Sequence, residues 1–135
     1  KVINMMSALQ MCTVPKFSIV MRKSYGQAYL NMGGTRNSDE MLAWYSADVG
    51  FMDPNVGVNV VYGVKREDDP ARFEQLVQEI QRDSSAYDLA GIFSAVAVID
   101  PRESRQWLAR LLEVHQRRTA KGIGKHLLSG WPTTF

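Results

Sequence analysis

Apolar residues occur along the chain in short runs whose spacing changes repeatedly between helical and strand-like. Four residues near the start recur at helical spacing and predict a buried helix: Val2, Met5, Met6 and Leu9. Pro15 cannot continue that helix and marks a break. Residues 16–21 then show little polar alternation, which is typical of a short, fully buried strand.

A glycine-containing segment follows this strand. We expect a sharp turn at Gly26 and a short helix over residues 26–32, which the glycine pair at 33–34 would end. Residues 41–45 and 49–52 are apolar runs that fit two further strands. Strand and helix signals therefore alternate through the first third of the chain.

Residues 53–62 carry conflicting signals. Asp53 and Pro54 have the form of a helix N-cap followed by proline at the first helical position. Residues 56–62, however, are rich in valine and prefer a strand. The residues alone leave this segment open between helix and strand.

The next helix has clearer signals. Asp69 caps it, Pro70 opens it, and four apolar residues share one face: Phe73, Leu76, Val77 and Ile80. Residues 84–89 fit another short helix, and residues 95–99 fit a buried strand.

A last helix follows Asp100 and Pro101, which together with Glu103 form a variant of the capping box. We expect it to end near Arg118, with five residues on its inner face: Trp107, Leu108, Leu111, Leu112 and His115. Residues 121–135 form a tail that needs a surface to pack on. Strands that alternate with helices in this way predict an α/β fold.

Length and composition favour a single domain with a real core. The chain has 135 residues, 45% of them hydrophobic, and its 16 basic and 14 acidic side chains leave a net charge of +2. This balance gives no case for a nucleic-acid or membrane partner. The single cysteine, Cys12, excludes an internal disulfide. We expect a cytoplasmic protein, or one of the mitochondrial matrix if it is eukaryotic, and a piece of something longer, because no cap precedes the first helix.

Common catalytic motifs are absent from the sequence. Cys12, His115 and His126 are too scattered for a metal site, and we expect His115 to face the core or cap a helix. Ser24 lacks a nucleophile-elbow context, and neither the dinucleotide fingerprint nor the P-loop pattern occurs. Four basic residues are read as favourable charge at a helix C-terminus: Arg117, Arg118, Lys121 and Lys125.

The turn from Tyr25 to Tyr29 is the remaining chemical candidate. Backbone N–H groups in the first turn of a helix have no intrahelical acceptor and can bind an anion. One interpretation is therefore an oxyanion hole, in which Gly26 and Ala28 let a ligand approach the backbone closely. The other is a packed strand-to-helix turn, which the local pattern alone favours.

A resemblance to a known family covers most of the chain. It begins at residues 14–29, which read Val-Pro-Lys-Phe-Ser-Ile-Val-Met-Arg-Lys-Ser-Tyr-Gly-Gln-Ala-Tyr. It continues through residues 32–34, 43–44, 47–52 and 57–62, and resumes at residues 91–105. This pattern resembles the C-terminal half of the carboxyltransferase (beta) subunits of biotin-dependent acyl-CoA carboxylases, of the propionyl-CoA carboxylase and methylmalonyl-CoA carboxyltransferase type. The resemblance implies a partial crotonase-like (ClpP/crotonase) fold, a spiral of ββα units, and favours a helix for residues 56–62.

The resemblance also implies a function. Members of this family move a carboxyl group from carboxybiotin to the α-carbon of a short-chain acyl-CoA such as propionyl-CoA. Residues 1–135 would be the C-terminal carboxyltransferase domain, without the N-terminal acyl-CoA domain, and would be inactive alone. The implied partners are the biotin carboxyl carrier protein, the biotin carboxylase subunit, the chain's own N-terminal domain and further copies in a homo-oligomer, expected to be a hexamer.

Site residues are carried over by position. The backbone N–H groups of Gln27 and Ala28 would bind the ureido oxygen of biotin as an oxyanion hole, Gly26 would permit the turn, and Leu30 would lie near the acyl pocket. The family commonly has glycine where this chain has Gln27, so a positive φ there would strain the residue. Two alternatives stay open: a biotin-dependent decarboxylase subunit that runs the transfer in reverse, and a non-catalytic assembly domain of the same fold.

Overall fold

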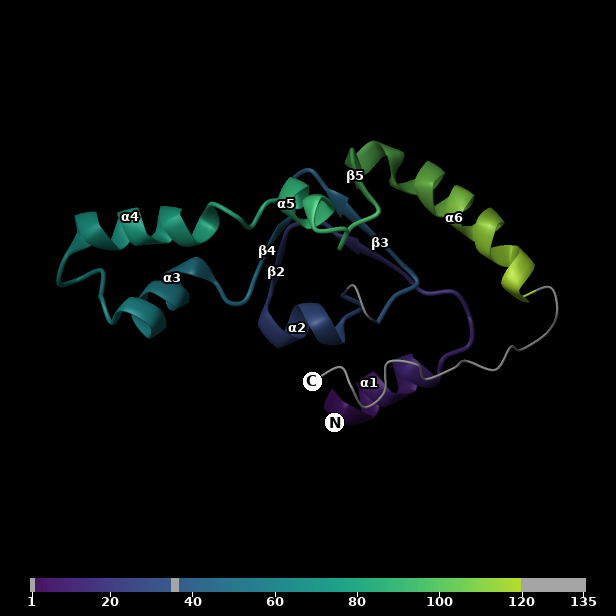
Figure 1. The fold of residues 1–135 in the computed structure, drawn as a ribbon, viewed down its shortest axis with the longest axis horizontal. Coiled ribbons are helices and arrows are strands. Elements are labelled where there is room, and N and C mark those ends of the chain that lie inside the picture. Colours follow the sequence, from purple (N-terminus) through teal and green to yellow (C-terminus); the bar gives the residue numbers. More distant parts are fainter. Residues whose placement is uncertain (1, 35–36, 120–135) are drawn as a thin grey trace.

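The computed structural model describes residues 2–34 and 37–119, which form two small parallel sheets with helices around them (Figure 1). The larger sheet has three strands in the order β1 (Phe17–Val20), β3 (Glu40–Trp44) and β5 (Ala97–Ile99). The smaller sheet pairs β2 (Lys23–Tyr25) with β4 (Asp48–Gly50). Parallel strands separated by helices confirm the predicted α/β class.

Six α-helices are described: α1 (Val2–Met11), α2 (Gly26–Asn31), α3 (Pro54–Gly57), α4 (Pro70–Gln81), α5 (Ala86–Gly91) and α6 (Ser104–Thr119). The π-helical segment η1 (Val58–Tyr62) continues α3, and the 3₁₀ turn η2 (Pro101–Glu103) precedes α6. Residues 56–62 are therefore helical, and the strand alternative is wrong. None of the helices described has the length and apolar character that crossing a membrane requires.

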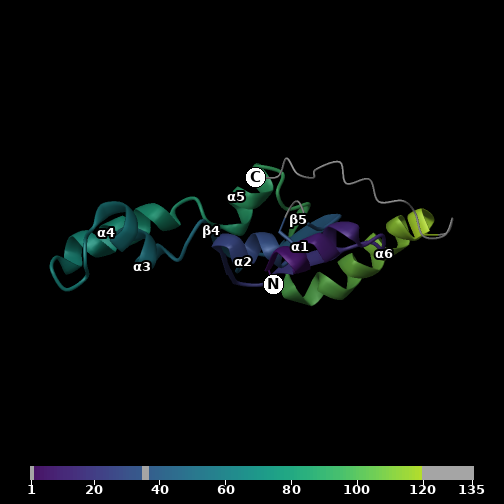
Figure 2. The ribbon, with the colours of Figure 1, turned by 90° about the horizontal axis from the view of Figure 1, so that it is seen from below.

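Helices cover both faces of the larger sheet (Figures 1 and 2). Because successive strand residues point to opposite faces, each face has its own buried cluster. The α6 side contains Leu42, Ile99 and Leu111. The side that carries α5 contains seven residues, against which Tyr29 of α2 also packs: Val20, Met41, Ala43, Ala47, Ala86, Leu89 and Ala95.

The α3, η1 and α4 segments form a unit that projects from the sheets (Figure 2). It has a small core of its own, formed by Val58, Phe73 and Val77. Leu76 and Ile80 pack against this core, so the predicted apolar face of α4 is confirmed. The core of this unit is therefore formed by residues of the unit itself.

His115 confirms the prediction of a core-facing histidine. Its side chain is buried, and its Nε2 atom lies 3.1 Å from Oε1 of Glu40. The imidazole also meets the ring of Phe17 edge-on, with 5.3 Å between ring centroids. His115 thus ties α6 to the beginning of both β1 and β3.

Three expectations about burial are wrong. Helix α1 contains no buried residue, because it lies beside α2 and outside the layers around the sheet (Figure 1). In β1 only Val20 is buried. Leu112 is 50% exposed, because the stripe through Trp107, Leu111 and His115 faces the sheet and Leu112 lies a helical step away from it.

Several residues singled out in the sequence lie outside what the structure describes. These are the side chains of Arg117 and Arg118, the residues Lys121, Lys125 and His126, and the rest of the tail 121–135. Their expected roles stay predictions.

The larger sheet makes a direct prediction about stability. Leu42 is fully buried at the centre of the sheet, so Leu42→Ala should lower the free energy of unfolding by about 2–5 kcal/mol. Leu112→Ala is the matched control, because half of that side chain is exposed, and it should lower the same quantity by about 1 kcal/mol or less. Urea denaturation of the variants measures both values. Equal losses for the two leucines would contradict the assigned layers.

The cap of η2 makes a prediction about pH. Hydrogen bonds from the Arg102 side chain and backbone lower the pKa of Asp100 to about 2. The unfolded chain, with the ordinary higher pKa, binds the proton first, so this stabilisation is present above about pH 4 and is lost as the pH falls towards about 2. Asp100→Asn should therefore reduce the loss of unfolding free energy between about pH 5 and pH 2.5.

The matched control for this measurement is Asp68→Asn, which replaces an exposed aspartate that does not cap a helix. Urea denaturation at both pH values gives the comparison. If Asp68→Asn flattens the pH dependence as much as Asp100→Asn does, the cap is not the source of the effect.

Candidate functional site

The chain turns sharply where β2 meets α2. Tyr25 is the N-cap of α2, with an extended backbone at φ −120° and ψ 147°, and Gly26 follows with φ +62°. A Cβ atom at Gly26 would lie 3.0 Å from the carbonyl oxygen of Phe51. Both the left-handed backbone and the lack of space therefore require glycine at this position.

Gln27 stands in a different backbone region from Gly26. Among the described residues, Phe93 is the one non-glycine residue with a positive φ, and Gln27 lies inside α2. A side chain at residue 27 therefore causes no left-handed strain. Gln27 and Ala28 are both exposed in the first turn of α2, where N–H groups lack intrahelical acceptors. Such a turn can present backbone donors to an anion from the solvent side.

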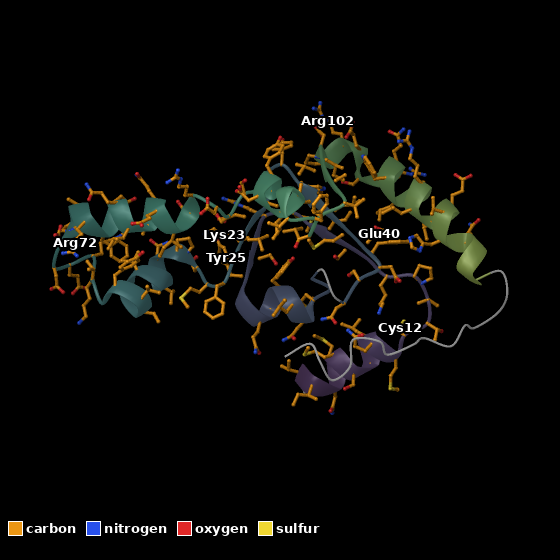
Figure 3. All side chains as sticks on the ribbon, in the orientation of Figure 1. Cys12, Lys23, Tyr25, Glu40, Arg72 and Arg102 are labelled. Carbon is orange, nitrogen blue, oxygen red and sulfur yellow. The ribbon has the colours of Figure 1, made fainter. Side chains whose placement is uncertain are left out.

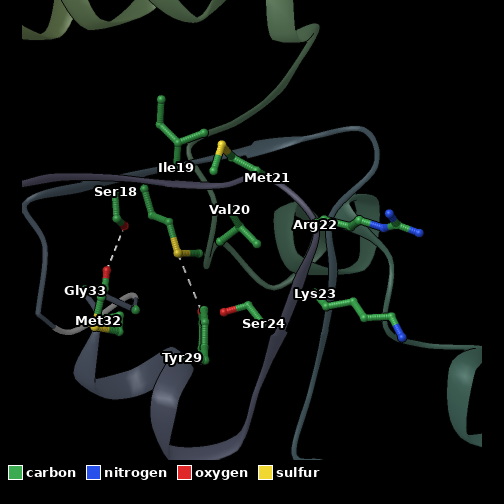
Figure 4. Close-up of a pocket in the computed structure, with 12 residues that line it drawn as sticks. Ser18, Ile19, Val20, Met21, Arg22, Lys23, Ser24, Tyr29, Met32 and Gly33 are labelled. Atoms are coloured by element: carbon green, nitrogen blue, oxygen red, sulfur yellow. Dashed lines mark hydrogen bonds between the residues drawn. The ribbon is translucent and has the colours of Figure 1, made fainter. Parts of the chain in front are cut away.

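Gly33, with φ +101°, ends α2 as predicted, and a cavity of about 370 Å³ lies between this helix and β1 (Figure 4). The Ser18 hydroxyl donates to the Gly33 carbonyl at 2.7 Å, and the Tyr29 hydroxyl lies 3.6 Å from Sδ of Met41. The residues that line the cavity do not include Gln27, Ala28 or Leu30. The cavity and the predicted donor turn are therefore separate features of α2.

Leu30 lies on α2, and its side chain is 48% exposed. Its carbonyl accepts a hydrogen bond from Nδ2 of the buried Asn37, which fixes the backbone at this point. The structure thus brings Gly26, Gln27, Ala28 and Leu30 together in one short helix, and the role of Leu30 in an acyl pocket stays a prediction.

Sequence reasoning missed a polar pair directly before this helix. The Tyr25 hydroxyl donates a hydrogen bond to Oδ2 of Asp48. Burial raises the pKa of Tyr25 well above its ordinary value, and the hydrogen bond and negative charge of Asp48 raise it further. The phenol therefore keeps its proton and remains a donor at neutral pH.

The signal that identifies Asp48 is the strand register, which the sequence does not display. Lys23 pairs with Asp48 and Tyr25 pairs with Gly50, so Tyr25 reaches Asp48 diagonally across the two strands. The Oδ1 atom of Asp48 is buried and has no hydrogen-bond partner within the described part of the chain. Asp48 therefore relies on Tyr25 for its side-chain hydrogen bonding there.

No group of three or more His, Cys, Asp or Glu side chains that could hold a metal ion occurs in residues 2–34 and 37–119. Cys12 is a free, partly exposed thiol. Among the described residues, the candidate site therefore offers backbone N–H donors, the hydrogen-bonded pair of Tyr25 and Asp48, and apolar side chains.

The turn predicts opposite responses at two adjacent positions. Gly26→Ala places a Cβ in a left-handed conformation against the Phe51 carbonyl, so it should destabilise the protein by more than about 1 kcal/mol. Gln27→Ala changes an exposed helical residue and should shift the unfolding free energy by less than about 0.5 kcal/mol. Chemical denaturation measures both variants. A tolerated Gly26→Ala would contradict the described turn.

Comparison with known proteins relates the chain to one family. The family model described as carboxyl transferase domain matches residues 3–126. The methylmalonyl-CoA carboxyltransferase 12S subunit of Propionibacterium freudenreichii subsp. shermanii is 32% identical over 129 residues, which cover 91% of this chain and 25% of the relative. The methylmalonyl-CoA decarboxylase subunit alpha of Veillonella parvula is 30% identical over 126 residues, covering 90% of this chain and 24% of that relative.

A solved structure shows the same arrangement. The crystal structure of transcarboxylase 12S, described for its hexamer assembly and with methylmalonyl-coenzyme A and methylmalonic acid bound, matches with a TM-score of 0.77 and 31% identity. The match covers 85% of this chain and 22% of that one. The chain spans about a quarter of the length of the curated relatives it matches. With nearly its whole length matched, the chain belongs to the carboxyl transferase domain family.

Proposed function

We propose that this chain is the biotin-side half of an acyl-CoA carboxyltransferase. The complete enzyme would move a carboxyl group from carboxybiotin to the α-carbon of a short-chain acyl-CoA such as propionyl-CoA. The observation that carries the proposal is the turn at Gly26 in a chain of this family: the glycine is required there, and Gln27 and Ala28 are exposed directly behind it.

The backbone of this turn suits the role of an oxyanion hole. When bound, biotin supplies the ureido group that carries the carboxyl group. The N–H groups of Gln27 and Ala28 would donate to the ureido oxygen and stabilise the negative charge that develops on it, and a donor of this kind is worth about 3 kcal/mol of barrier. Gln27 fits because its φ is not positive. Leu30, apolar and half exposed in the same helix, would border an apolar acyl group.

The coverage of the relatives supports a domain assignment. We propose that residues 1–135 form the C-terminal carboxyltransferase domain of a longer protein whose N-terminal domain holds the acyl-CoA, and that the α/β layers are part of a crotonase-like spiral of ββα units. The partners would be a biotin carboxyl carrier protein, a biotin carboxylase subunit and other copies of the chain in the cytoplasm. The hexamer assembly described for transcarboxylase 12S supports the oligomer.

A second candidate is a decarboxylase subunit that transfers the carboxyl group from acyl-CoA to biotin. The similarity to the methylmalonyl-CoA decarboxylase subunit alpha of Veillonella parvula favours it specifically. The same donors serve both directions, because one transition state is crossed from either side. A non-catalytic assembly domain has weaker support, since its main argument was strain at Gln27 and the φ there is not positive.

The experiment removes one backbone donor from the parent protein. Ala28→Pro deletes the N–H group in the first turn of α2, where no intrahelical hydrogen bond is lost, and also disfavours the helical backbone of Gln27 before it, so it should lower kcat for transfer from carboxybiotin to propionyl-CoA about 100-fold or more. Ala28→Gly keeps the N–H group and is the matched control, expected to retain activity within about threefold. Radiolabelled carboxyl transfer measures both rates.

The same assay separates the alternatives. Residues 1–135 alone should be inactive. Release of carboxyl from methylmalonyl-CoA to biotin, with no transfer to propionyl-CoA in any coupled system, would favour the decarboxylase. The absence of transfer in both directions with the unmodified parent protein would refute the enzyme proposal and leave the assembly domain.

A further inference from the structure

Besides their backbone pairing, the two strands of the smaller sheet are joined by a side-chain hydrogen bond between the Tyr25 hydroxyl and Oδ2 of Asp48. Tyr25 lies on β2 with Lys23, between the larger sheet and the projecting unit of α3 and α4 (Figure 3). A hydrogen bond to a carboxylate is stronger than one between neutral groups. This bond therefore fixes the far end of the Tyr25 ring.

At its backbone, Tyr25 is also the N-cap residue of α2. The ring lies against Gly50, its partner in the strand pair: a Cβ atom there would be 3.6 Å from Cδ1 of Tyr25. The backbone angles of Tyr25 and Gly26 set the direction in which α2 leaves the strand. A ring held both at its hydroxyl and along its side holds those angles too.

Asp48 can act as an anchor because its own backbone is tied on two sides. Its N–H group donates to the Arg22 carbonyl at 3.0 Å, and the next N–H group, that of Val49, donates to the Ser84 carbonyl at 2.8 Å. The buried Oδ1 atom has no partner in the described residues. Loss of the Tyr25 hydroxyl would therefore leave a partly buried carboxylate without any side-chain hydrogen bond there, which disfavours alternative positions of the ring.

We infer that Asp48 is a positioning residue, which holds Tyr25 and through it the turn at Gly26 in the orientation that carboxyl transfer needs. The inference rests on the proposed function and adds a residue to its machinery. Asp48 does not touch the reacting atoms. It lies one strand away and acts through the Tyr25 ring.

The test compares Asp48→Ala, Asp48→Asn and Tyr25→Phe in the parent protein. Asp48→Ala and Tyr25→Phe delete the hydrogen bond and should each lower kcat for carboxyl transfer about tenfold or more, with the KM for acyl-CoA changed less than about twofold. Asp48→Asn keeps a neutral acceptor and should show a smaller loss. Tyr45→Phe is the matched control, because it removes an exposed tyrosine hydroxyl at the end of β3, and it should leave kcat unchanged.

Hydrogen exchange followed by mass spectrometry supplies a readout that does not depend on activity. The N–H groups of Met32 and Gly34 donate to the carbonyls of Ala28 and Tyr29, so exchange in residues 29–34 reports how firmly α2 is held. Asp48→Ala should accelerate exchange in this segment about tenfold or more while leaving β3 unchanged. Equal acceleration in α2 and β3 would indicate general destabilisation and overturn the inference.

The two readouts separate this inference from the proposed function. If the unmodified parent protein transfers no carboxyl group, the proposed function fails, and local loosening of residues 29–34 still decides whether Asp48 positions the turn. If transfer occurs and Asp48→Ala keeps both full kcat and slow exchange in α2, the positioning role is refuted while the function stands.

Discussion

The parallel pairing of β2 with β4 is the constraint on which the candidate site depends. Two strands of three residues are too short to be stable alone. They are held because each continues a strand of the larger sheet: β1 leads into β2, and β3 leads into β4. Paired residues are 23 positions apart in β1 and β3 but 25 apart in β2 and β4. An even shift preserves which face each side chain occupies, so Tyr25 can still reach Asp48.

The elements that could be predicted from the sequence are those with local signals. Asp53, Asp69 and Asp100 each precede a proline, and each accepts a backbone N–H bond as an N-cap in the structure. The helix before Gly33 and the apolar face of α4 follow from the same kind of evidence, because caps, prolines and periodicity act within a few residues. The valines of residues 56–62 alone favour a strand. The resemblance to the family favours a helix there, and the structure has a helix.

Features that depend on distant partners could not be predicted in this way. The hydrogen bond between Tyr25 and Asp48 requires the register of β2 against β4, and no periodic pattern within three residues reveals that register. Helix α1 has apolar residues at helical spacing, yet none of its residues is buried. Its exposure depends on where the helix packs in the fold, and the spacing of its apolar residues does not reveal that position. Leu112 was misassigned for a related reason, since the sheet contacts a narrow stripe of α6.

The glycine requirement of the turn belongs to residue 26 and not to residue 27. Gly26 has the positive φ and no room for a Cβ, whereas Gln27 occupies a position that any L-residue can adopt. A departure from the family pattern at Gln27 therefore introduces no left-handed strain into the turn. What it changes is the solvent side of the turn, where a flexible polar side chain now stands beside the N–H groups of the first helical turn. Under the proposed function, Gln27 would act on access to the donors, and Asp48, through Tyr25, would act on their direction.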